Sequence, residues 1–254
     1  MNQNKLVFAN WKMNLNLDNA TSLVRDILDR LKNINHVDVV LSPSFPYLSA
    51  VHSLISSSKI SLSSQNVFWE EDGPFTGEVS SEMLRDVGCS WAMIGHSERR
   101  QHLLETNEMI NKKVLTSVAK DLRVILCVGE SFDQRRQEKT YESIADQLQR
   151  GLRKVDERFL KQIVIGYEPI WVIGSGKAAS VDDISSVHNF IFNELKLMFP
   201  SSELLPRIVY GGSVNSSNIE DIVALENVNG VLVGNASMDC DKFCDIVMKV
   251  EDSK

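Results

Sequence analysis

Ionisable side chains and glycine-containing turns stand just after apolar segments of this sequence, where they could do chemistry together. The ionisable and amide residues in these positions are Asn10, Lys12, His96, Glu98 and Glu168, and the turns are 174–176, 211–213 and 234–235. A carboxylate and an imidazole can transfer protons, and an ammonium can stabilise developing negative charge. Glycine turns and helix starts let backbone amides approach a phosphate. The combination predicts proton transfer on a phosphorylated substrate.

Eight short, β-rich apolar segments precede these residues and recur from end to end of the chain. They are Lys5–Ala9, Val37–Leu41, Ile60–Ser64, Trp91–Ile94, Leu122–Cys127, Gln162–Gly166, Arg207–Tyr210 and Gly230–Val233. The stretches between them have helical periodicity. Three apolar stripes show it: one from Ala20 to Leu31, one of Tyr141, Ile144, Leu148 and Leu152, and one from Ile184 to Met198.

Strands that alternate with helices and are almost continuously apolar indicate a parallel sheet covered by helices. A closed barrel and an open sheet both satisfy this pattern. We favour an α/β fold with a single (β/α)8 barrel over residues 1–254, because no linker divides the chain and about 250 residues is the usual size of such a barrel. In both architectures the chemistry gathers on loops at the carboxyl ends of the strands.

Composition excludes several classes of protein. The chain has 254 residues, of which 43% are hydrophobic and 24% charged, and a formal net charge of -7 with neutral histidines. An acidic chain has no general basic field for nucleic acid or an anionic membrane, so we expect neither as a partner. The longest uninterrupted apolar run, Val124–Val128, is far shorter than the roughly 20 residues that span a bilayer. We expect a soluble, cytoplasmic protein without a targeting peptide.

The four cysteines show neither a metal-knuckle nor a CxxC pattern, and the one close pair has no histidine nearby. They are Cys89, Cys127, Cys240 and Cys244. We interpret all four as buried or incidental thiols and expect no metal site.

Several motifs around the strand-end residues occur in the order and spacing of one known family. The matching segments are 10–14 (NWKMN), 75–80 (FTGEVS), 94–100 (IGHSERR), 127–130 (CVGE), 167–177 (YEPIWVIGSGK) and 210–214 (YGGSV). Through them the chain resembles the triosephosphate isomerase family over its whole length. The resemblance implies a TIM barrel that interconverts dihydroxyacetone phosphate and glyceraldehyde 3-phosphate in glycolysis and gluconeogenesis, without metal or organic cofactor.

The resemblance also implies a role for each ionisable residue, in a family that is a standard example of acid–base tuning. Glu168 is similar to the general base that moves a proton between neighbouring carbons. His96 resembles the neutral imidazole that polarises the carbonyl, and Lys12 the cation beside the developing oxyanion and the phosphate. Asn10 is expected to orient the substrate and Glu98 to support the catalytic groups.

A lid and a phosphate grip are further expectations from the resemblance. The lid residues are Pro169, Ile170, Trp171, Val172, Ile173, Gly174, Ser175, Gly176 and Lys177. Closing would bring the Gly174 amide onto the phosphate and press Ile173, with Leu232 opposite, over Glu168. Amides of Ser213, Gly234 and Asn235 would complete the phosphate site. Water would then be excluded from a reactive intermediate.

Four residues depart from the family pattern: Asn235, Leu15, Pro74 in the third loop and Ala178 in the lid. Asn235 stands where a second glycine is usual, and we expect weaker phosphate affinity because asparagine adopts positive φ less readily than glycine. Leu15 replaces a glycine that often follows Asn14, which could alter the rigidity of the loop.

An obligate homodimer is the expected assembly, because residues 65–80 resemble a protruding loop that inserts beside the neighbouring subunit's active site. The expected interface residues are Met13, Gln65, Phe75, Thr76 and Glu78.

Two other functions stay open from the residues. An aldolase or another barrel isomerase on a phosphorylated sugar is one, although an aldolase needs a lysine placed for a Schiff base, and Lys12 stands with Asn10 in a different pattern. The other is a catalytically impaired barrel that binds phosphometabolites or partner proteins. Loss of Glu168 or His96 would favour that reading, and both residues are present.

Overall fold

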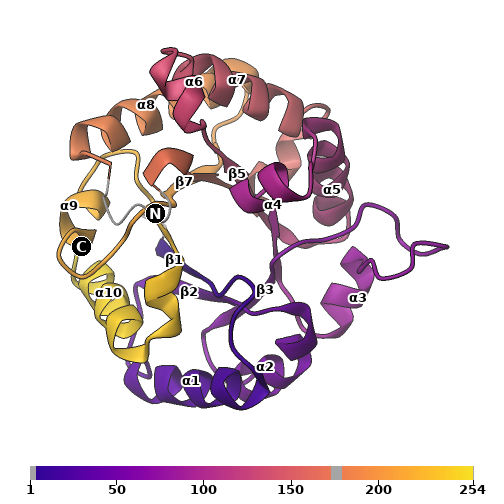
Figure 1. The fold of residues 1–254 in the computed structure, drawn as a ribbon, viewed down its shortest axis with the longest axis vertical. Helices are drawn as coiled ribbons and strands as arrows, with labels where there is room; N and C mark the ends of the chain where they lie inside the picture. Colours follow the sequence, from indigo (N-terminus) through magenta and orange to yellow (C-terminus); the bar gives the residue numbers. More distant parts are fainter. Residues whose placement is uncertain (1–3, 173–178, 254) are drawn as a thin grey trace.

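The computed structural model describes residues 4–172 and 179–253 and shows a closed barrel of eight parallel strands (Figure 1). The strands are β1 (Lys5–Asn10), β2 (Val37–Ser42), β3 (Ser61–Ser64), β4 (Trp91–Ile94), β5 (Arg123–Val128), β6 (Ile163–Tyr167), β7 (Arg207–Tyr210) and β8 (Gly230–Val233). Each strand pairs with its neighbours in chain order. Because β1 pairs with β8 as well as with β2, the sheet has no free edge, and the barrel prediction is confirmed over the open sheet.

The helices form an outer ring around the barrel, as Figure 1 shows. The α-helices are α1 (Leu17–Arg30), α2 (Leu48–Ile55), α3 (Ser81–Asp86), α4 (Ser97–His102), α5 (Asn107–Ala119), α6 (Phe132–Arg136), α7 (Thr140–Gly151), α8 (Val181–Met198), α9 (Ile219–Val223) and α10 (Cys240–Asp252). Short 3-10 helices are η1 (Phe45–Tyr47), η2 (Glu157–Gln162), η3 (Ile170–Val172) and η4 (Asn235–Met238). None of the helices within the described residues has the length and apolar character needed to cross a bilayer.

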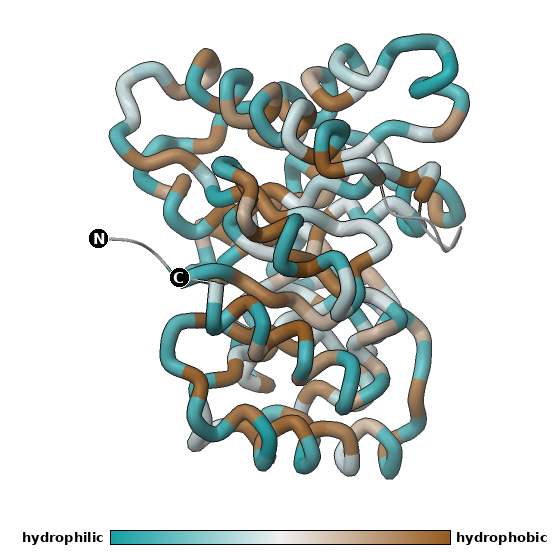
Figure 2. The backbone as a smooth tube through the Cα atoms, turned by 90° about the vertical axis from the view of Figure 1, so that its left-hand side faces the viewer, coloured by the Kyte–Doolittle hydropathy of each residue, from teal (hydrophilic) through white to brown (hydrophobic). Residues whose placement is uncertain are grey.

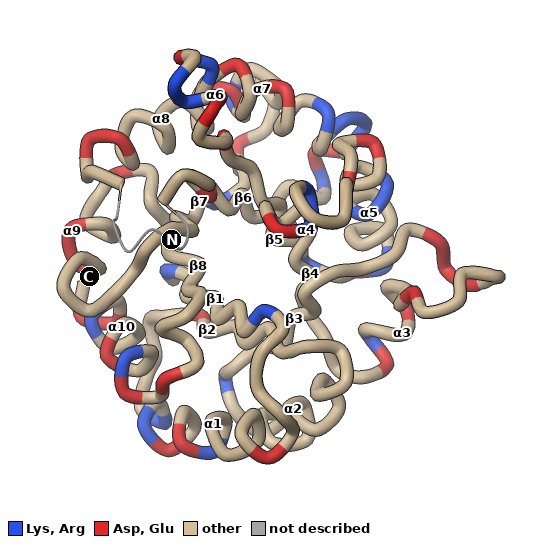
Figure 3. Tube along the Cα trace, viewed as in Figure 1, with Lys and Arg blue, Asp and Glu red and all other residues tan. Residues whose placement is uncertain are grey.

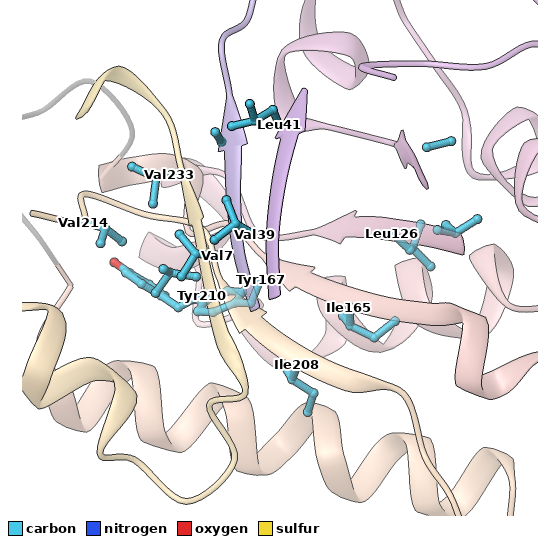
Figure 4. Packing of buried hydrophobic residues seen from close by; sticks show 14 of the residues in the cluster. Val7, Val39, Leu41, Leu126, Ile165, Tyr167, Ile208, Tyr210, Val214 and Val233 are labelled. Atoms are coloured by element: carbon cyan, nitrogen blue, oxygen red, sulfur yellow. The ribbon is translucent and has the colours of Figure 1, made fainter. Parts of the chain in front are cut away.

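The core has two layers because alternate residues of each strand face opposite sides of the barrel wall. One cluster fills the interior and includes Phe8, Trp91 and Met93, with the Phe8 and Trp91 rings meeting edge to face at 5.1 Å. The larger cluster lies between the strands and the helices, and Figure 4 shows part of it, including Val7 and Val39. Hydrophobic stretches accordingly concentrate along the central strands and inner helix faces in Figure 2.

The predicted strands agree with the observed ones to within one residue at each end. Three match fully, and β1 and β2 run one residue further than predicted because the polar Asn10 and Ser42 still pair. The strands β3, β5 and β6 each begin one residue later than predicted. The expected apolar stripes of α1, α7 and α8 are also present, with one correction. Tyr141 does not lie on the buried face of α7 but is 46% exposed, where its ring packs on Phe190 at 4.7 Å.

His188 is a buried histidine that lies behind the barrel wall, apart from the strand ends. His188 of α8 is fully buried between the rings of Tyr167 and Tyr210, and its Nδ1 lies 2.9 Å from the carbonyl oxygen of Asn227. A carbonyl only accepts, so Nδ1 carries the ring proton, while Nε2 finds no partner among the described residues. Burial lowers the pKa of His188 to about 4 from an ordinary 6.5.

We expect His188 to weaken the fold as the solution becomes acidic. Between about pH 6.5 and pH 4 the unfolded chain binds this proton and the folded chain does not, so stability falls as pH falls through this window. A shift of this size corresponds to about 3 kcal/mol in total. Urea unfolding at several pH values should show a shallower pH dependence for His188→Gln than for the unsubstituted chain. Parallel slopes would contradict the assignment, and the exposed His36→Gln serves as the matched control.

Candidate active site

A cavity of about 560 Å³ opens at the carboxyl ends of the strands. Its lining comes from β1 and β8 and from the segments that follow β1, β4, β6, β7 and β8. Figure 3 shows that most charged positions lie along the outer ring of helices and loops. The predicted site residues that line it are Asn10, Lys12, His96, Glu98, Glu168, Ile170, Ser213, Leu232, Gly234 and Asn235. The barrel therefore brings together residues that are far apart in sequence.

A carboxylate and an imidazole form the buried centre of this cavity. Oε1 of Glu168 lies 3.0 Å from Nε2 of His96, and Oε2 accepts a hydrogen bond of 3.1 Å from the backbone amide of Ser97. The Nδ1 atom of His96 accepts a hydrogen bond of 3.3 Å from the amide of Glu98. A nitrogen that accepts is unprotonated, so the proton of the neutral ring is on Nε2 and points at Glu168.

The two groups shift each other's pKa in opposite directions. Burial alone raises the pKa of Glu168, but the His96 charge and the hydrogen bonds from His96 and Ser97 hold it below its usual value. Glu168 is therefore ionised at neutral pH. Burial alone lowers the pKa of His96, but the adjacent Glu168 carboxylate holds it above its usual value. The Glu98 carboxylate adds to this rise, and the charge of Lys12 opposes it.

Lys12 is held in a left-handed backbone conformation at the edge of the cavity. Its φ is 53°, a region that costs a non-glycine residue about 1 kcal/mol or more. The Lys12 amide donates to Oδ1 of Asn10 at 2.9 Å, and its carbonyl accepts from Ser44 Oγ and Gln65 Nε2 at 2.9 and 2.8 Å. These bonds offset the strain and leave Nζ 2.6 Å from Oε1 of Glu98.

Two glycines are required by how closely the chain approaches Glu168. A Cβ built on Gly129 would lie 1.8 Å from the carbonyl oxygen of Glu168. A Cβ on Gly211 would lie 3.0 Å from Cγ of Glu168 and 3.4 Å from Cδ2 of Leu232. A larger residue at either position would displace the carboxylate, so these glycines position the candidate base.

The backbone at Asn235 corrects one expectation from the sequence. Asn235 begins η4 and is not among the described residues with positive φ. The predicted loss of phosphate affinity through a strained Asn235 therefore has no basis in the backbone. Leu15 does have a positive φ of 70°, a conformation that strains leucine and that glycine adopts freely.

The lid prediction falls partly on described residues. Ile173, Gly174 and the rest of 173–177 lie outside them, whereas Pro169 precedes η3, which contains Ile170, Trp171 and Val172. Nε1 of Trp171 donates to Oε1 of the buried Glu130 at 2.9 Å, and the Arg135 guanidinium stacks 4.2 Å from the Trp171 ring centre. The start of the predicted lid is thus tied to the segment after β5.

Sequence reasoning missed several residues of the cavity. Ser97, Gln101 and His102 line it, and the Ser97 amide is a direct donor to Glu168. The residue type of Ser97 does not indicate this contact, because it is made by the backbone amide. A helix that begins just after His96 would, however, leave free amide groups at its first residues. No cluster of three or more metal-binding side chains occurs among the described residues.

The predicted interface residues lie mostly at the surface. Met13 is 94% exposed and Phe75 is 40% exposed, and Thr76 and Glu78 are exposed as well. Gln65 is half-buried, because its amide donates to the carbonyls of Lys12 and Ser42. Figure 1 shows the segment between β3 and α3 reaching outward beyond the ring of helices.

Fold and site together define a (β/α)8-barrel protein with a buried acid–base pair and one adjacent lysine at the carboxyl end of the barrel. Comparisons with known proteins identify its family. The sequence profile described as triosephosphate isomerase matches residues 5–250. Relatives named triosephosphate isomerase are 40% identical in Endomicrobium trichonymphae, covering 95% of this chain and 97% of the relative, and 41% identical in Chloroherpeton thalassium, covering 97% and 99%.

A solved structure gives the same answer. The crystal structure of triosephosphate isomerase from Bartonella henselae matches with a TM-score of 0.87 and 29% identity, covering 96% of this chain and 98% of that one. The chain belongs to the triosephosphate isomerase family and is an enzyme of the isomerase class.

Proposed function

We propose that this chain interconverts dihydroxyacetone phosphate and D-glyceraldehyde 3-phosphate through an enediol or enediolate, with Glu168, His96, Lys12, Asn10 and Glu98 as its working groups. The observation that carries the proposal is the ionised Glu168 carboxylate, 3.0 Å from Nε2 of His96 inside the cavity. Burial by itself raises the pKa of Glu168, so the carboxylate becomes a stronger base once it leaves His96 and the Ser97 amide, and the ring proton of His96 can polarise a carbonyl.

Glu168 must change partners to act as the base. Both of its oxygens are engaged, one by His96 and one by the Ser97 amide. We propose that it leaves at least one of them and takes a proton from the carbon beside the substrate carbonyl. The C–H electron pair forms a C=C bond and the carbonyl pair moves onto the oxygen, which takes the proton from Nε2 of His96. His96 then takes a proton from the hydroxyl oxygen on the neighbouring carbon position, the new carbonyl forms there, and Glu168 returns its proton to the carbon that had carried the first carbonyl.

The same movement would make His96 a neutral donor. Burial and the charge of Lys12 lower the pKa of His96, whereas Glu168 and, as a smaller influence, Glu98 raise it. With Glu168 turned to the substrate, the lowering influences remain, and the α4 amide of Glu98 still donates to Nδ1. The imidazole then polarises the carbonyl without carrying a net charge.

The phosphate would be held at the other end of the cavity. Among the described cavity-lining residues Lys12 is the one lysine or arginine, and the turns with Ser213, Gly234 and Asn235 lie at the same opening, where Leu232 is also a lining residue. We propose that their backbone amides bind the phosphate, and that Gly174 and the lid 169–177 complete the enclosure. Asn10 and Glu98 would hold Lys12 in place, as their contacts with it indicate.

We also propose that residues 1–254 act as a single barrel domain and work as a cytoplasmic homodimer. The barrel uses strands from Lys5 to Val233, which supports one domain. The exposed side chains of Met13, Phe75 and Thr76, on and near the outward-reaching segment 65–80, support an interface that covers them. An exposed apolar side chain on a protruding segment, such as Phe75 here, is typical of subunit contacts.

The direct test is a coupled assay of the purified chain with glyceraldehyde 3-phosphate, at a protein concentration that keeps a dimer assembled. We expect turnover without added metal or cofactor. Ligand binding without turnover would support an impaired, phosphometabolite-binding barrel and overturn the proposed activity. Sedimentation at the same concentration tests the dimer separately, and a monomer with full turnover would contradict the obligate assembly.

A further inference from the structure

Two cysteine sulfurs touch on the first turn of α10. Cys240 is the first residue of this helix and Cys244 lies one turn later, with the two Sγ atoms 3.7 Å apart. Cys240 is partly exposed, whereas Cys244 is completely buried. The other two cysteines, Cys89 and Cys127, are buried at separate places. One accessible thiol in contact with one hidden thiol is the arrangement of an attacking and a resolving cysteine.

The surroundings favour Cys240 as the group that reacts first. Burial raises the pKa of Cys244 to about 12, so this sulfur keeps its proton and can donate it to Cys240. Burial raises the pKa of Cys240 above its usual value, and Asp26 and Asp241 add to this rise, but the Cys244 thiol and the guanidinium of Arg30 limit it. Cys240 also stands at the positive end of a 13-residue helix, where thiolates are stabilised.

We propose that Cys240 and Cys244 are a redox-active dithiol that a low-molecular-weight disulfide oxidises to a disulfide within α10. The Cys240 thiolate attacks one sulfur of the small disulfide, a mixed disulfide forms, and one small thiolate leaves. Cys244 then loses its proton and attacks Cys240, the mixed disulfide breaks, and the second small thiolate leaves. The protein loses two electrons and two protons, and the small disulfide is reduced to two thiols.

The bond would tighten the first turn of α10. Side chains four residues apart on a helix have Cβ atoms about 5–6 Å apart, whereas a disulfide needs about 3.5–4.5 Å. Asp239 caps this turn by accepting from the amide of Lys242 at 3.1 Å. The distortion therefore falls on the cap and on the chain just before it, which makes the disulfide easily reduced.

The chain just before this turn leads into the cavity. η4 ends at Met238, and within it Ser237 Oγ donates to the carbonyl of Gly234 at 2.7 Å. Gly234 and Asn235 line the cavity. If the proposed function holds, oxidation of the dithiol raises KM for the phosphorylated triose severalfold through this turn, with a smaller change in kcat.

Intact-mass measurement after treating the full, reduced chain with oxidised glutathione tests the proposal without an activity assay. We expect the unsubstituted chain to lose two hydrogen atoms and to recover them with a reducing thiol. The variant Cys244→Ala should stop at one mixed disulfide with glutathione, and Cys240→Ser should stay unmodified because Cys244 is buried. Peptide mapping should place the bond between Cys240 and Cys244.

Two results would overturn the dithiol. One is a lasting glutathione adduct on the unsubstituted chain, and the other is the same two-hydrogen loss in Cys240→Ser. Thermal unfolding of each variant shows whether it is folded, and Cys89→Ala should behave like the unsubstituted chain. The measurement of KM tests a separate point. If the mass changes occur but the chain has no isomerase activity, the redox-active dithiol is supported and the proposed function fails.

Discussion

Replacing Glu168 by glutamine should lower kcat about a thousandfold or more and leave the fold intact. Glutamine has nearly the same shape, and its amide oxygen can still accept from the Ser97 amide, so the local contacts of the buried side chain are largely kept. What it loses is the ability to take a proton. The effect should therefore fall on kcat far more than on KM.

A coupled assay with glyceraldehyde 3-phosphate measures this effect, with circular dichroism melting of the same samples to show that the variant is folded. The exposed Glu157→Gln is the matched control and should keep full activity. A kcat for Glu168→Gln within a few fold of the unsubstituted chain would mean that another group is the base.

Replacing Lys12 by methionine should lower kcat/KM at least about a hundredfold. Lys12 is the one lysine or arginine among the described residues that line the cavity, so its loss removes the main charge facing a dianionic phosphate and a developing oxyanion. It also leaves the Glu98 carboxylate, now 2.6 Å from Nζ, without its partner. An unpaired carboxylate repels the substrate.

A second substitution, Glu98→Gln, separates the loss of the Lys12 charge from the repulsion by an unpaired Glu98 carboxylate. Kinetics of the double variant Lys12→Met with Glu98→Gln should recover part of the loss if Glu98 repels the phosphate. The exposed Lys32→Met controls for a change in net charge and should have little effect. Unchanged kcat/KM in Lys12→Met would exclude the lysine from binding and from catalysis, and full recovery in the double variant would leave it only a neutralising role.

Much of the fold was predictable because the signals are local. Continuous apolar segments such as Val124–Val128 indicate strands buried on both faces, and the i, i+3, i+4 spacing of Ile184, Val187 and Ile191 indicates a helix that buries one side. Their strict alternation limits the architecture to a parallel sheet covered by helices. The prediction was wrong for Tyr141, because periodicity places a residue on a face but does not say how far the neighbouring helix covers it.

The candidate site was predictable as a set of residues because parallel strands end at the same side of a sheet. The resemblance to a known family supplied the roles, which remain proposals. Neither the spacing nor the resemblance showed that the Ser97 amide contacts Glu168, or that Asn10, Ser44 and Gln65 hold a left-handed Lys12. These contacts depend on backbone direction at single residues.

By itself the sequence determined which segments are strands and helices, and which side chains stand at the strand ends. Only the tertiary structure decided that the sheet closes, that Lys12 meets Glu98 across 86 positions, that Asn235 needs no positive φ, and that two apparently incidental cysteines touch. The physical reason is that burial and periodicity are properties of neighbours along the chain. Distances between atoms of remote residues follow instead from strand register and packing, which the whole barrel sets together.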